Sequence, residues 1–231
     1  MIEKVAFISD IHGNVEALKA VLEDMKNNGI DYDNVYCTGD IVGYGPRPNE
    51  VIEELRKHNI TSIMGNHDEA VGFFEVTKEK RNKLSNTLLW TVENIKEENK
   101  EFLKGLKKQL TIKVGEKNFL LTHGSSNSIS EYIFENDIIL QEEIASKLNE
   151  DIIVFGHTHI PYFKKVRGKV FINAGSVGKP KGGDNRACYC VVEVYNEIRV
   201  RFERVTYNIE KVVKEIEESE LLDEYAQMLR G

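Results

Sequence analysis

The sequence lacks the long hydrophobic runs that mark a membrane or secreted protein. None of its apolar runs approaches the roughly 20 residues of a membrane-spanning helix. The N-terminal stretch MIEKVAFISD mixes charged residues with a short apolar run, unlike a secretory leader. These absences argue against a membrane partner, and we expect a cytoplasmic location.

Cysteine is also scarce. The three cysteines, Cys37, Cys188 and Cys190, are odd in number and lie in strand-like sequence. Cys188 and Cys190 would share one face of a strand, so a metal-binding pair is conceivable, but no second pair accompanies them. We interpret all three as buried thiols in a reducing compartment.

An excess of positive charge is absent as well. The chain carries 31 basic and 38 acidic residues, a formal net charge of -7. This balance argues against broad nucleic-acid binding, which normally requires a clustered basic face. A small anionic substrate stays compatible with it if metal ions bring the positive charge.

What the chain does contain is typical of a globular domain. Its 231 residues are 41% hydrophobic and 30% charged, which is enough for a sizeable core. We find no internal repeat, low-complexity tract or linker. We therefore predict one domain over residues 1–231.

Short apolar runs alternate with helical patterns along the first two thirds of the chain. Each run is bounded by Gly, Asp or Asn, which favours buried strands; the runs cover residues 5–9, 34–39, 60–65, 118–124 and 151–156. Apolar residues at three-and-four spacing predict helices between them, over residues 15–25, 49–58 and 137–148. This alternation predicts an α/β layered architecture.

Two other segments differ in composition and in residue pattern. Residues 75–108 are rich in Lys and Glu around an apolar stripe over 84–95, which predicts a helical flank; the stripe is either core or a subunit contact in a homo-oligomer. After residue 160, hairpin patterns turn at Arg167–Gly168 and Asn196. An amphipathic helix from about Ile209 is expected to close the chain.

Polar residues of a restricted kind follow each of the five predicted strands. They are Asp10, His12, Asp40, Asn66, His67, His123, His157 and His159. Side chains beyond the carboxyl ends of such strands converge on the crevice where α/β proteins bind ligands. Five of the six histidines belong to this set, and the sixth, His58, lies near a predicted helix end.

Each of these residues has an ordinary alternative explanation. An aspartate after a strand often caps a helix, and a triplet such as Asn-His-Asp can form a turn. Capping does not explain why almost every histidine of the chain is at one edge. We therefore predict a metal centre, with too many ligands for a single ion and without thiolates. Two divalent ions sharing a carboxylate suit phosphoryl chemistry; we expect manganese first, with iron, zinc, nickel or cobalt as alternatives.

The ordered blocks Asp-x-His, Gly-Asp, Gly-Asn-His-Asp, His-Gly and Gly-His-x-His resemble the signature of the calcineurin-like metallophosphoesterases. The stretches GDIVGYGPRPNE and INAGSVGKPKGGDNRACY further resemble its branch of small prokaryotic phosphodiesterases. The resemblance implies a four-layer α-β-β-α sandwich with two facing mixed sheets.

The resemblance also implies a role for each strand-end residue. Asp10, His12 and His159 would hold one metal, and Asn66, His123 and His157 the other. Asp40 would bridge the two metals, and His67 would be the catalytic histidine.

One position departs from the protein-phosphatase members of the family. They have an aspartate three residues after the bridging one to support the catalytic histidine, whereas this chain has Gly43. His67 must then find another orienting partner, either Asp68 or a backbone group. The protein-phosphatase interpretation is weakened accordingly.

Three further residues are candidates for substrate binding. Arg47 and, in the glycine-rich loop, Lys179 or Lys181 could contact a phosphate, and we select Arg47 and Lys181; solvated loop charges are the alternative. Tyr44 could stack on a base or serve in packing.

The sequence therefore predicts a metal-dependent phosphoesterase acting on small phosphodiesters or phosphomonoesters, including nucleotides. A hydroxide bridging the metals would attack phosphorus, and His67 would protonate the leaving oxygen. A dinucleoside polyphosphate hydrolase is the alternative within this class. A non-catalytic protein-binding scaffold of the same fold is the alternative from another class.

Overall fold

The computed structural model of the chain describes residues 3–75, 84–219, 221 and 223–230. Within these residues the strands form two mixed five-stranded sheets. The first has the order β10-β9-β1-β2-β3, with β1 (Glu3–Ile8), β2 (Val35–Cys37), β3 (Thr61–Ser62), β9 (Ala187–Val194) and β10 (Ile198–Val205). The second has the order β4-β5-β6-β8-β7, with β4 (Gln109–Val114), β5 (Lys117–Thr122), β6 (Ile152–Phe155), β7 (Tyr162–Val166) and β8 (Lys169–Asn173).

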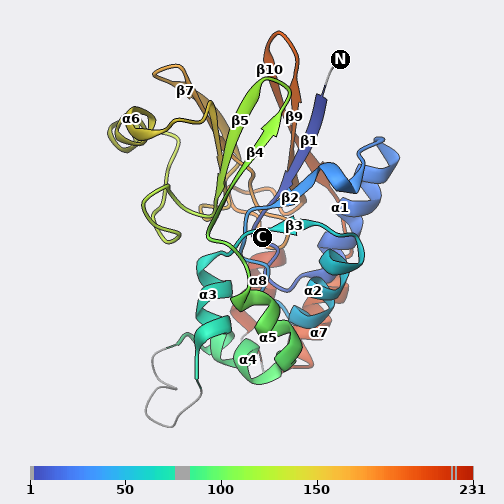
Figure 1. The fold of residues 1–231 in the computed structure, drawn as a ribbon. Helices are drawn as coiled ribbons and strands as arrows, with labels where there is room; N and C mark the ends of the chain where they lie inside the picture. The colour runs from blue at the N-terminus through green and yellow to red at the C-terminus, as the bar shows by residue number, and fades with distance from the viewer. Residues whose placement is uncertain (1–2, 76–83, 220, 222, 231) are drawn as a thin grey trace.

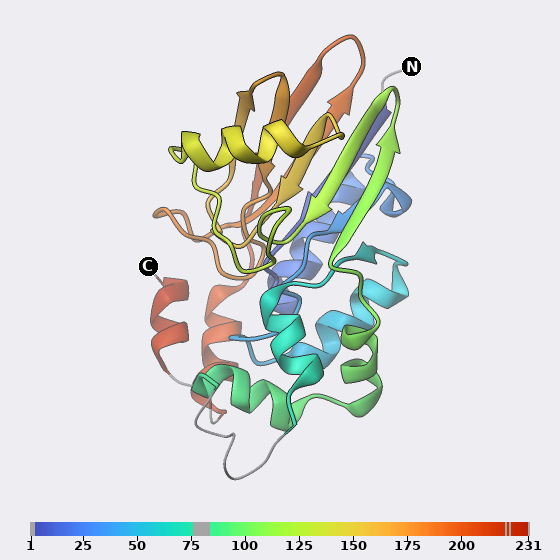
Figure 2. The ribbon, with the colours of Figure 1, turned by 60° about the vertical axis from the view of Figure 1, so that its left-hand side comes forward.

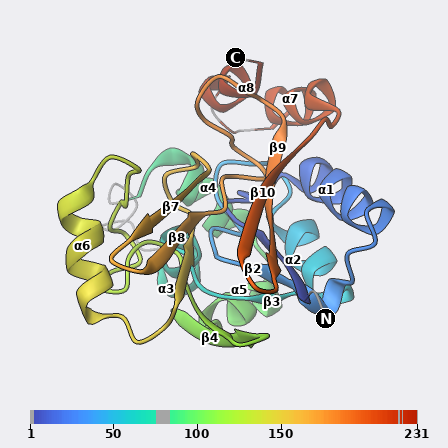
Figure 3. The ribbon, with the colours of Figure 1, turned by 90° about the horizontal axis from the view of Figure 1, so that it is seen from above.

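Helices cover the outer faces of both sheets, as Figures 1 and 3 show. The helices are α1 (Val15–Asn27), α2 (Pro48–Lys57), α3 (Asn66–Phe73), α4 (Asn86–Asn94), α5 (Glu97–Lys104), α6 (Ile138–Lys147), α7 (Ile209–Glu217) and α8 (Asp223–Arg230), with a 3-10 turn η1 at Tyr32–Asn34. Helices α1 and α2 pack on the first sheet, and α6 packs on the second. Helices α3 to α5 and α7 to α8 gather at one end of the sheets (Figure 2).

The two sheets pack face to face through apolar side chains. Phe7 of β1 stacks on Phe119 of β5 with 5.9 Å between ring centroids, and both are fully buried. Val154 of β6 and Val192 of β9 belong to the same cluster. Separate cores lie between each sheet and its helices, so the predicted four-layer α-β-β-α sandwich is confirmed.

Each sheet has three parallel strands, and these carry the loops of interest. In the first sheet β1 pairs in parallel with β2 and β2 with β3; in the second β5 pairs in parallel with β6 and β6 with β8. Parallel neighbours end at the same edge of a sheet. The polar residues that follow these strands are therefore brought to one end of the molecule.

Residues at both ends of helix α1 explain why it starts and stops where it does. Asn14 caps α1 because its side-chain oxygen accepts a hydrogen bond from the Ala17 amide at 3.1 Å. Gly29, two residues after the helix, adopts a φ of 67°, a left-handed conformation that glycine tolerates without steric cost. Val15, Leu18 and Val21 point from α1 into the core.

Three expectations about the elements need correction. Strand β4 was not predicted, because its half-buried edge position leaves an alternating, partly charged sequence instead of an apolar run. The strand expected over 60–65 is reduced to the two residues of β3. The single closing helix expected from Ile209 is instead α7 followed by a second helix, α8, which packs against it.

The helical flank is observed as α4 and α5, while residues 76–83 of the expected flank lie outside the described residues. Of its apolar stripe, Val92 is buried, and Leu84, Leu88 and Ile95 pack on the core beside α1 and α2. These side chains therefore contribute to the core. No helix within the described ranges combines the length and the apolar character that crossing a bilayer requires.

The stacked rings between the sheets should dominate stability. We expect Phe7→Ala to lower the free energy of unfolding by about 3–5 kcal/mol, because the truncation leaves a cavity between two rigid sheets. Urea titration followed by circular dichroism measures this. Tyr195→Ala, at a side chain 63% exposed, is the control and should change the free energy little.

Candidate active site

The loops after the parallel strands contain an unusual number of left-handed residues. Asp10, His12, Asp40, His157 and His159 have φ values of 52°, 51°, 53°, 65° and 63°. A positive φ at a residue other than glycine is uncommon, and costs on the order of 1–3 kcal/mol. All five belong to the predicted metal ligands. The backbone is therefore held in a costly conformation at the predicted site.

Backbone hydrogen bonds between the loops maintain this conformation. The amides of Asp10 and His12 donate to the carbonyls of Gly39 and Asp40, each at 3.0 Å. The amide of Gly156 donates to the His123 carbonyl at 3.0 Å, which joins two loops of the second sheet. The loops are thus connected to one another, and the side chains they carry have fixed positions.

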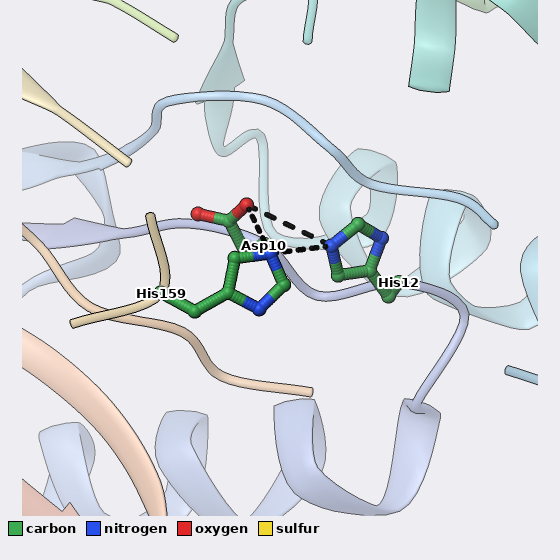
Figure 4. Close-up of side chains that lie close together, drawn as sticks. All are labelled: Asp10, His12 and His159. Atoms are coloured by element: carbon green, nitrogen blue, oxygen red, sulfur yellow. Dashed lines mark hydrogen bonds and ion pairs between the residues drawn. The ribbon is translucent and has the colours of Figure 1, made fainter. Parts of the chain in front are cut away.

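The first cluster consists of Asp10, His12 and His159, whose polar atoms point toward one another in Figure 4. The Nε2 atom of His159 lies 3.2 Å from His12 Nε2 and 3.2 Å from Asp10 Oδ1. The Nδ1 atoms of His12 and His159 face the carbonyls of Val42 and Lys179, at 3.2 and 2.6 Å. Since a carbonyl only accepts, each Nδ1 carries the proton and each Nε2 presents a lone pair.

This arrangement is electrostatically unfavourable unless a cation joins it. Two nitrogen lone pairs and a carboxylate oxygen converge in a fully buried space, and Asp10 Oδ1 has no hydrogen-bond partner among the described residues. Buried acceptors without donors are rare in proteins. A divalent cation would convert the repulsion into coordination, so these residues fit the metal that the sequence predicts.

The second cluster combines imidazole, amide and carboxylate groups. His123 Nδ1 donates to the Thr38 carbonyl at 2.9 Å, which directs its Nε2 toward two acceptors. These are Asn66 Oδ1 at 3.1 Å and Asp40 Oδ2 at 3.2 Å. His157 donates from Nε2 to the Ser130 carbonyl at 3.2 Å, so its Nδ1 is the nitrogen free to bind a metal.

Asp40 lies between the two clusters. Its Oδ2 atom is 3.2 Å from His123 Nε2 in the second cluster and 3.7 Å from His12 Nε2 in the first. One carboxylate oxygen is thus within reach of ligands on both sides. The distances agree with the bridging position that the resemblance implies for this residue.

Burial and neighbouring charges set the protonation of the ligands. Burial lowers the pKa of His12 to about 3 and, together with the charge of His123, that of His157 to about 4. Both imidazoles are therefore neutral and able to bind metal at neutral pH. Burial opposes ionisation of Asp10 and Asp40, but the surrounding histidines hold the pKa of each carboxyl well below its usual range.

His123 behaves in the opposite way. Burial opposes its protonation, but the adjacent Asp40 carboxylate raises the pKa of His123 to about 9. A proton on this imidazole thus serves as the counter-charge of Asp40. A divalent cation between the same two groups would replace that proton.

Comparison with known proteins agrees with this geometry. Residues 4–197 match the model of the calcineurin-like phosphoesterase superfamily domain. The chain belongs to this superfamily. An uncharacterized protein of Methanocaldococcus jannaschii is 36% identical to it over 234 residues, which cover 94% of this chain and 93% of the relative.

Characterised relatives and a solved structure extend the match. The phosphodiesterase YfcE of Escherichia coli is 29% identical over 205 residues, covering 82% of this chain and 87% of YfcE. The crystal structure of a metallophosphoesterase from Sphaerobacter thermophilus is 29% identical, with a TM-score of 0.84 and 98% coverage of both chains. The chain is therefore a metal-dependent phosphoric ester hydrolase of the small prokaryotic phosphodiesterase branch.

In this phosphoesterase His67 lies at the rim of the centre, with its side chain 13% exposed. Its amide donates to Asp40 Oδ1 at 2.9 Å, and its Nε2 lies 3.9 Å from Asp40 Oδ2. The His67 and His12 rings are 4.8 Å apart at their centroids. His67, His12 and Asp40 also form a group of three whose ligand atoms lie within 4.8 Å of one another.

The orienting partner sought for His67 is not found. Asp68 accepts hydrogen bonds from the amides of Ile41, Val42 and Gly65, so its carboxylate braces the loops instead of the imidazole. His67 Nδ1 is buried without a hydrogen-bond partner among the residues that the structure describes. A Cβ atom at Gly43 would lie only 2.4 Å from that nitrogen. Glycine at this position therefore provides space for the ring, which is positioned by packing.

The three predicted substrate contacts have different surroundings. Tyr44 lies at the site, with its ring centroid 4.9 Å from His12 and 5.0 Å from His67. The Arg47 guanidinium is bound by Glu215 at 3.1 and 3.0 Å and by Glu50 at 3.0 Å. Lys181 is exposed in its loop.

Lys179, the alternative to Lys181 in the glycine-rich loop, is 92% buried, and its Nζ lies 3.7 Å from the centroid of the Tyr44 ring. The backbone carbonyls that orient the histidines were also missed. Any residue type carries a carbonyl, so the sequence contains no signal for them.

Metal analysis tests the position of Asp40. We expect Asp40→Ala to weaken manganese binding at both clusters by more than about tenfold, since loss of a hydrogen-bond partner of a ligand alone costs that much. Asp33→Ala, at an exposed aspartate, is the matched control. The measurement is equilibrium dialysis followed by elemental analysis. If Asp40→Ala kept the manganese content of the wild type, Asp40 would not be a ligand shared by the two metal ions.

Proposed function

We propose that the protein hydrolyses small phosphodiesters or phosphomonoesters at a centre of two divalent metal ions. The observation that carries the proposal is Asp40 Oδ2, which is within 3.7 Å of imidazole nitrogens from both ligand clusters. Asp10, His12 and His159 would hold one ion, and Asn66, His123 and His157 the other. Nitrogen and oxygen ligands without a thiolate support manganese first, and iron, zinc, nickel or cobalt as alternatives.

Charge supports a phosphate ester as the substrate. The candidate ligands include two carboxylates, so two divalent ions would leave a net positive charge at the rim of an acidic protein. When bound, the ions supply Lewis acidity, which lowers the pKa of water and stabilises charge on phosphoryl oxygens.

His67 is the proposed proton donor. With no acceptor beside Nδ1, the proton of the neutral ring is favoured on Nε2, which is directed toward Asp40 and the rim. The neutral ring can donate a hydrogen bond from this atom to a phosphoryl oxygen, and the imidazolium can transfer its Nε2 proton to the leaving oxygen. Burial lowers the pKa of His67, and the Asp40 carboxylate opposes that shift. A lowered pKa makes the protonated ring a stronger acid.

Lys179 is the proposed anion contact, in addition to the exposed Lys181. A buried ammonium is normally paired with a carboxylate. Within the described part of the chain, Lys179 makes no ion pair, and its ammonium lies over the Tyr44 ring. Burial lowers the pKa of Lys179 to about 8, with a contribution from Lys181. A substrate oxygen would supply the missing counter-charge.

Activity measurements test the function and the role of His67 together. We expect the manganese-loaded protein to hydrolyse bis-p-nitrophenyl phosphate, and His67→Ala to lower kcat by about 10²–10⁴ because the proton donor is lost. Manganese content should stay near that of the wild type. Full activity in His67→Ala would refute the donor role, and inactivity of the wild type with all five metals would refute the function.

A pair of variants tests the lysines. We expect Lys179→Met to raise KM for the same diester by roughly 10–100-fold, the usual loss for a hydrogen bond to a charged group. Lys181→Met is the matched control and should raise KM less, since Lys181 is exposed. Steady-state kinetics at fixed manganese measures both. An equal effect of the two changes would assign no special role to Lys179.

The remaining sequence-based predictions have different support. A dinucleoside polyphosphate is an alternative substrate and belongs in the same assays. The scaffold alternative loses its support, because the candidate ligands and His67 converge in one centre.

We also propose a cytoplasmic location, which three buried free thiols support. We propose one domain over residues 1–231, which the packing of α7 and α8 on Tyr44 and Trp90 supports. A homo-oligomer stays a prediction.

A further inference from the structure

Two aromatic side chains beside the metal centre are exposed. Tyr132 and Phe134, in the loop between β5 and α6, are 46% and 45% exposed. Their rings stack with centroids 5.5 Å apart and planes inclined by 8°. Tyr132 also stacks on His157, with 4.0 Å between centroids and an angle of 22°. The rings thus form a continuous aromatic stack from a candidate metal ligand outward to solvent.

The backbone under this stack is anchored. Ile133, between the two aromatic residues, is buried in the core beneath α6, and its carbonyl accepts from the Tyr162 hydroxyl at 2.9 Å. The carbonyl of Phe134 accepts from the buried Gln141 side chain at 2.7 Å. Exposure alternates along this segment, with Ile133 buried and Tyr132 and Phe134 exposed, so anchoring Ile133 holds both rings on the solvent side. The aromatic pair is therefore preorganised.

A pocket of about 300 Å³ adjoins the stack. Its lining combines apolar and polar side chains: Phe134, Glu135, Asn136, Thr158, Ile160 and Tyr162. Phe134 of the lining stacks on Tyr132, which stacks on His157, so the pocket lies beside the outer end of the stack that leads to the metal centre. Glu135 disfavours a second anionic group there. The lining suits a neutral planar group with hydrogen-bonding edges.

We propose that Tyr132 and Phe134 bind the planar aromatic group, a nucleobase or an aryl ring, of a substrate whose phosphate occupies the metal centre. The inference rests on the proposed function, because the phosphate position is taken from it. It places the aromatic group beside His157 and Ile160. Among the residues that line the pocket, Glu135 is the charged one. The substrates selected by this surface are aromatic phosphate esters.

Binding to the manganese-loaded protein tests this without relying on turnover. Equilibrium dialysis uses hydrolysis-resistant phosphonates, comparing the 5′-methylenephosphonate analogue of AMP with that of ribose 5-phosphate, and phenylphosphonate with methylphosphonate. We expect each aromatic compound to bind about 5–100-fold more tightly than its partner, the range found for stacking of a base on an aromatic side chain. A preference in the AMP pair alone identifies a nucleobase site, and a preference in both pairs identifies a general aryl site.

Variants connect the preference to the stack. Phe134→Ala is the deciding change, because Tyr132 contacts a candidate ligand and its removal could disturb the metal. We expect Phe134→Ala to reduce the ratio toward one, with unchanged manganese content. Tyr195→Ala, at an exposed aromatic residue of the β9–β10 turn, is the matched control and should keep the ratio.

The outcomes separate this inference from the proposed function. If the wild type hydrolyses diesters but shows no aromatic preference, or keeps it in Phe134→Ala, the aromatic site is wrong and the function stands. If the preference depends on Phe134 but no ester is hydrolysed, the function fails and the site stands. Sedimentation analysis completes the test. Ile139 of α6 is 84% exposed and serves as a second probe of this surface. A dimer that dissociates in Phe134→Ala and Ile139→Ala, with an unchanged binding ratio, would make this surface a subunit contact and overturn the inference.

Discussion

The centre of this protein depends on electrostatic repulsion between buried acceptors. Carbonyl groups hold the protons of His12 and His159 on Nδ1, so their Nε2 lone pairs face each other at 3.2 Å, and that of His159 also faces Asp10 Oδ1 at 3.2 Å. No rotation within the first cluster relieves this without breaking a buried hydrogen bond to a carbonyl. A cation is the partner that satisfies all of these atoms at once. The chemistry of the site follows from that requirement.

The fold tolerates this repulsion because the backbone around it is held strongly. Two packed sheets align the ends of their parallel strands, and interloop hydrogen bonds fix the left-handed residues that follow. Asp68 contributes three further bonds to loop amides, and its burial, with the charge of Asp40, raises its pKa to about 7. The Asp68 side chain therefore holds in place the backbone of the loops that carry the ligands. The core between the sheets supplies the stability that offsets the strain.

The surroundings of the centre divide it into regions of different chemistry. Lys179 and Tyr44 bring a cation and an aromatic face to one part of the rim. Tyr132 and Phe134 form a neutral aromatic stack against His157. His67 lies against His12 and Tyr44, held by packing in the space that Gly43 leaves. The aromatic stack is the basis of the substrate preference proposed above.

The sequence alone determined the layered α/β class, most strands and the identity of the candidate ligands, because apolar periodicity and the placement of histidines after strands are local patterns. It also carried the family signature that the comparisons confirm. Only the tertiary structure decided how the ligands face one another. His12 and His159 are 147 residues apart, and their tautomers depend on carbonyls that any residue could supply. The contacts of Asp68, Lys179 and Tyr132 were likewise decided by packing, since burial and stacking between distant segments leave no mark in the local sequence.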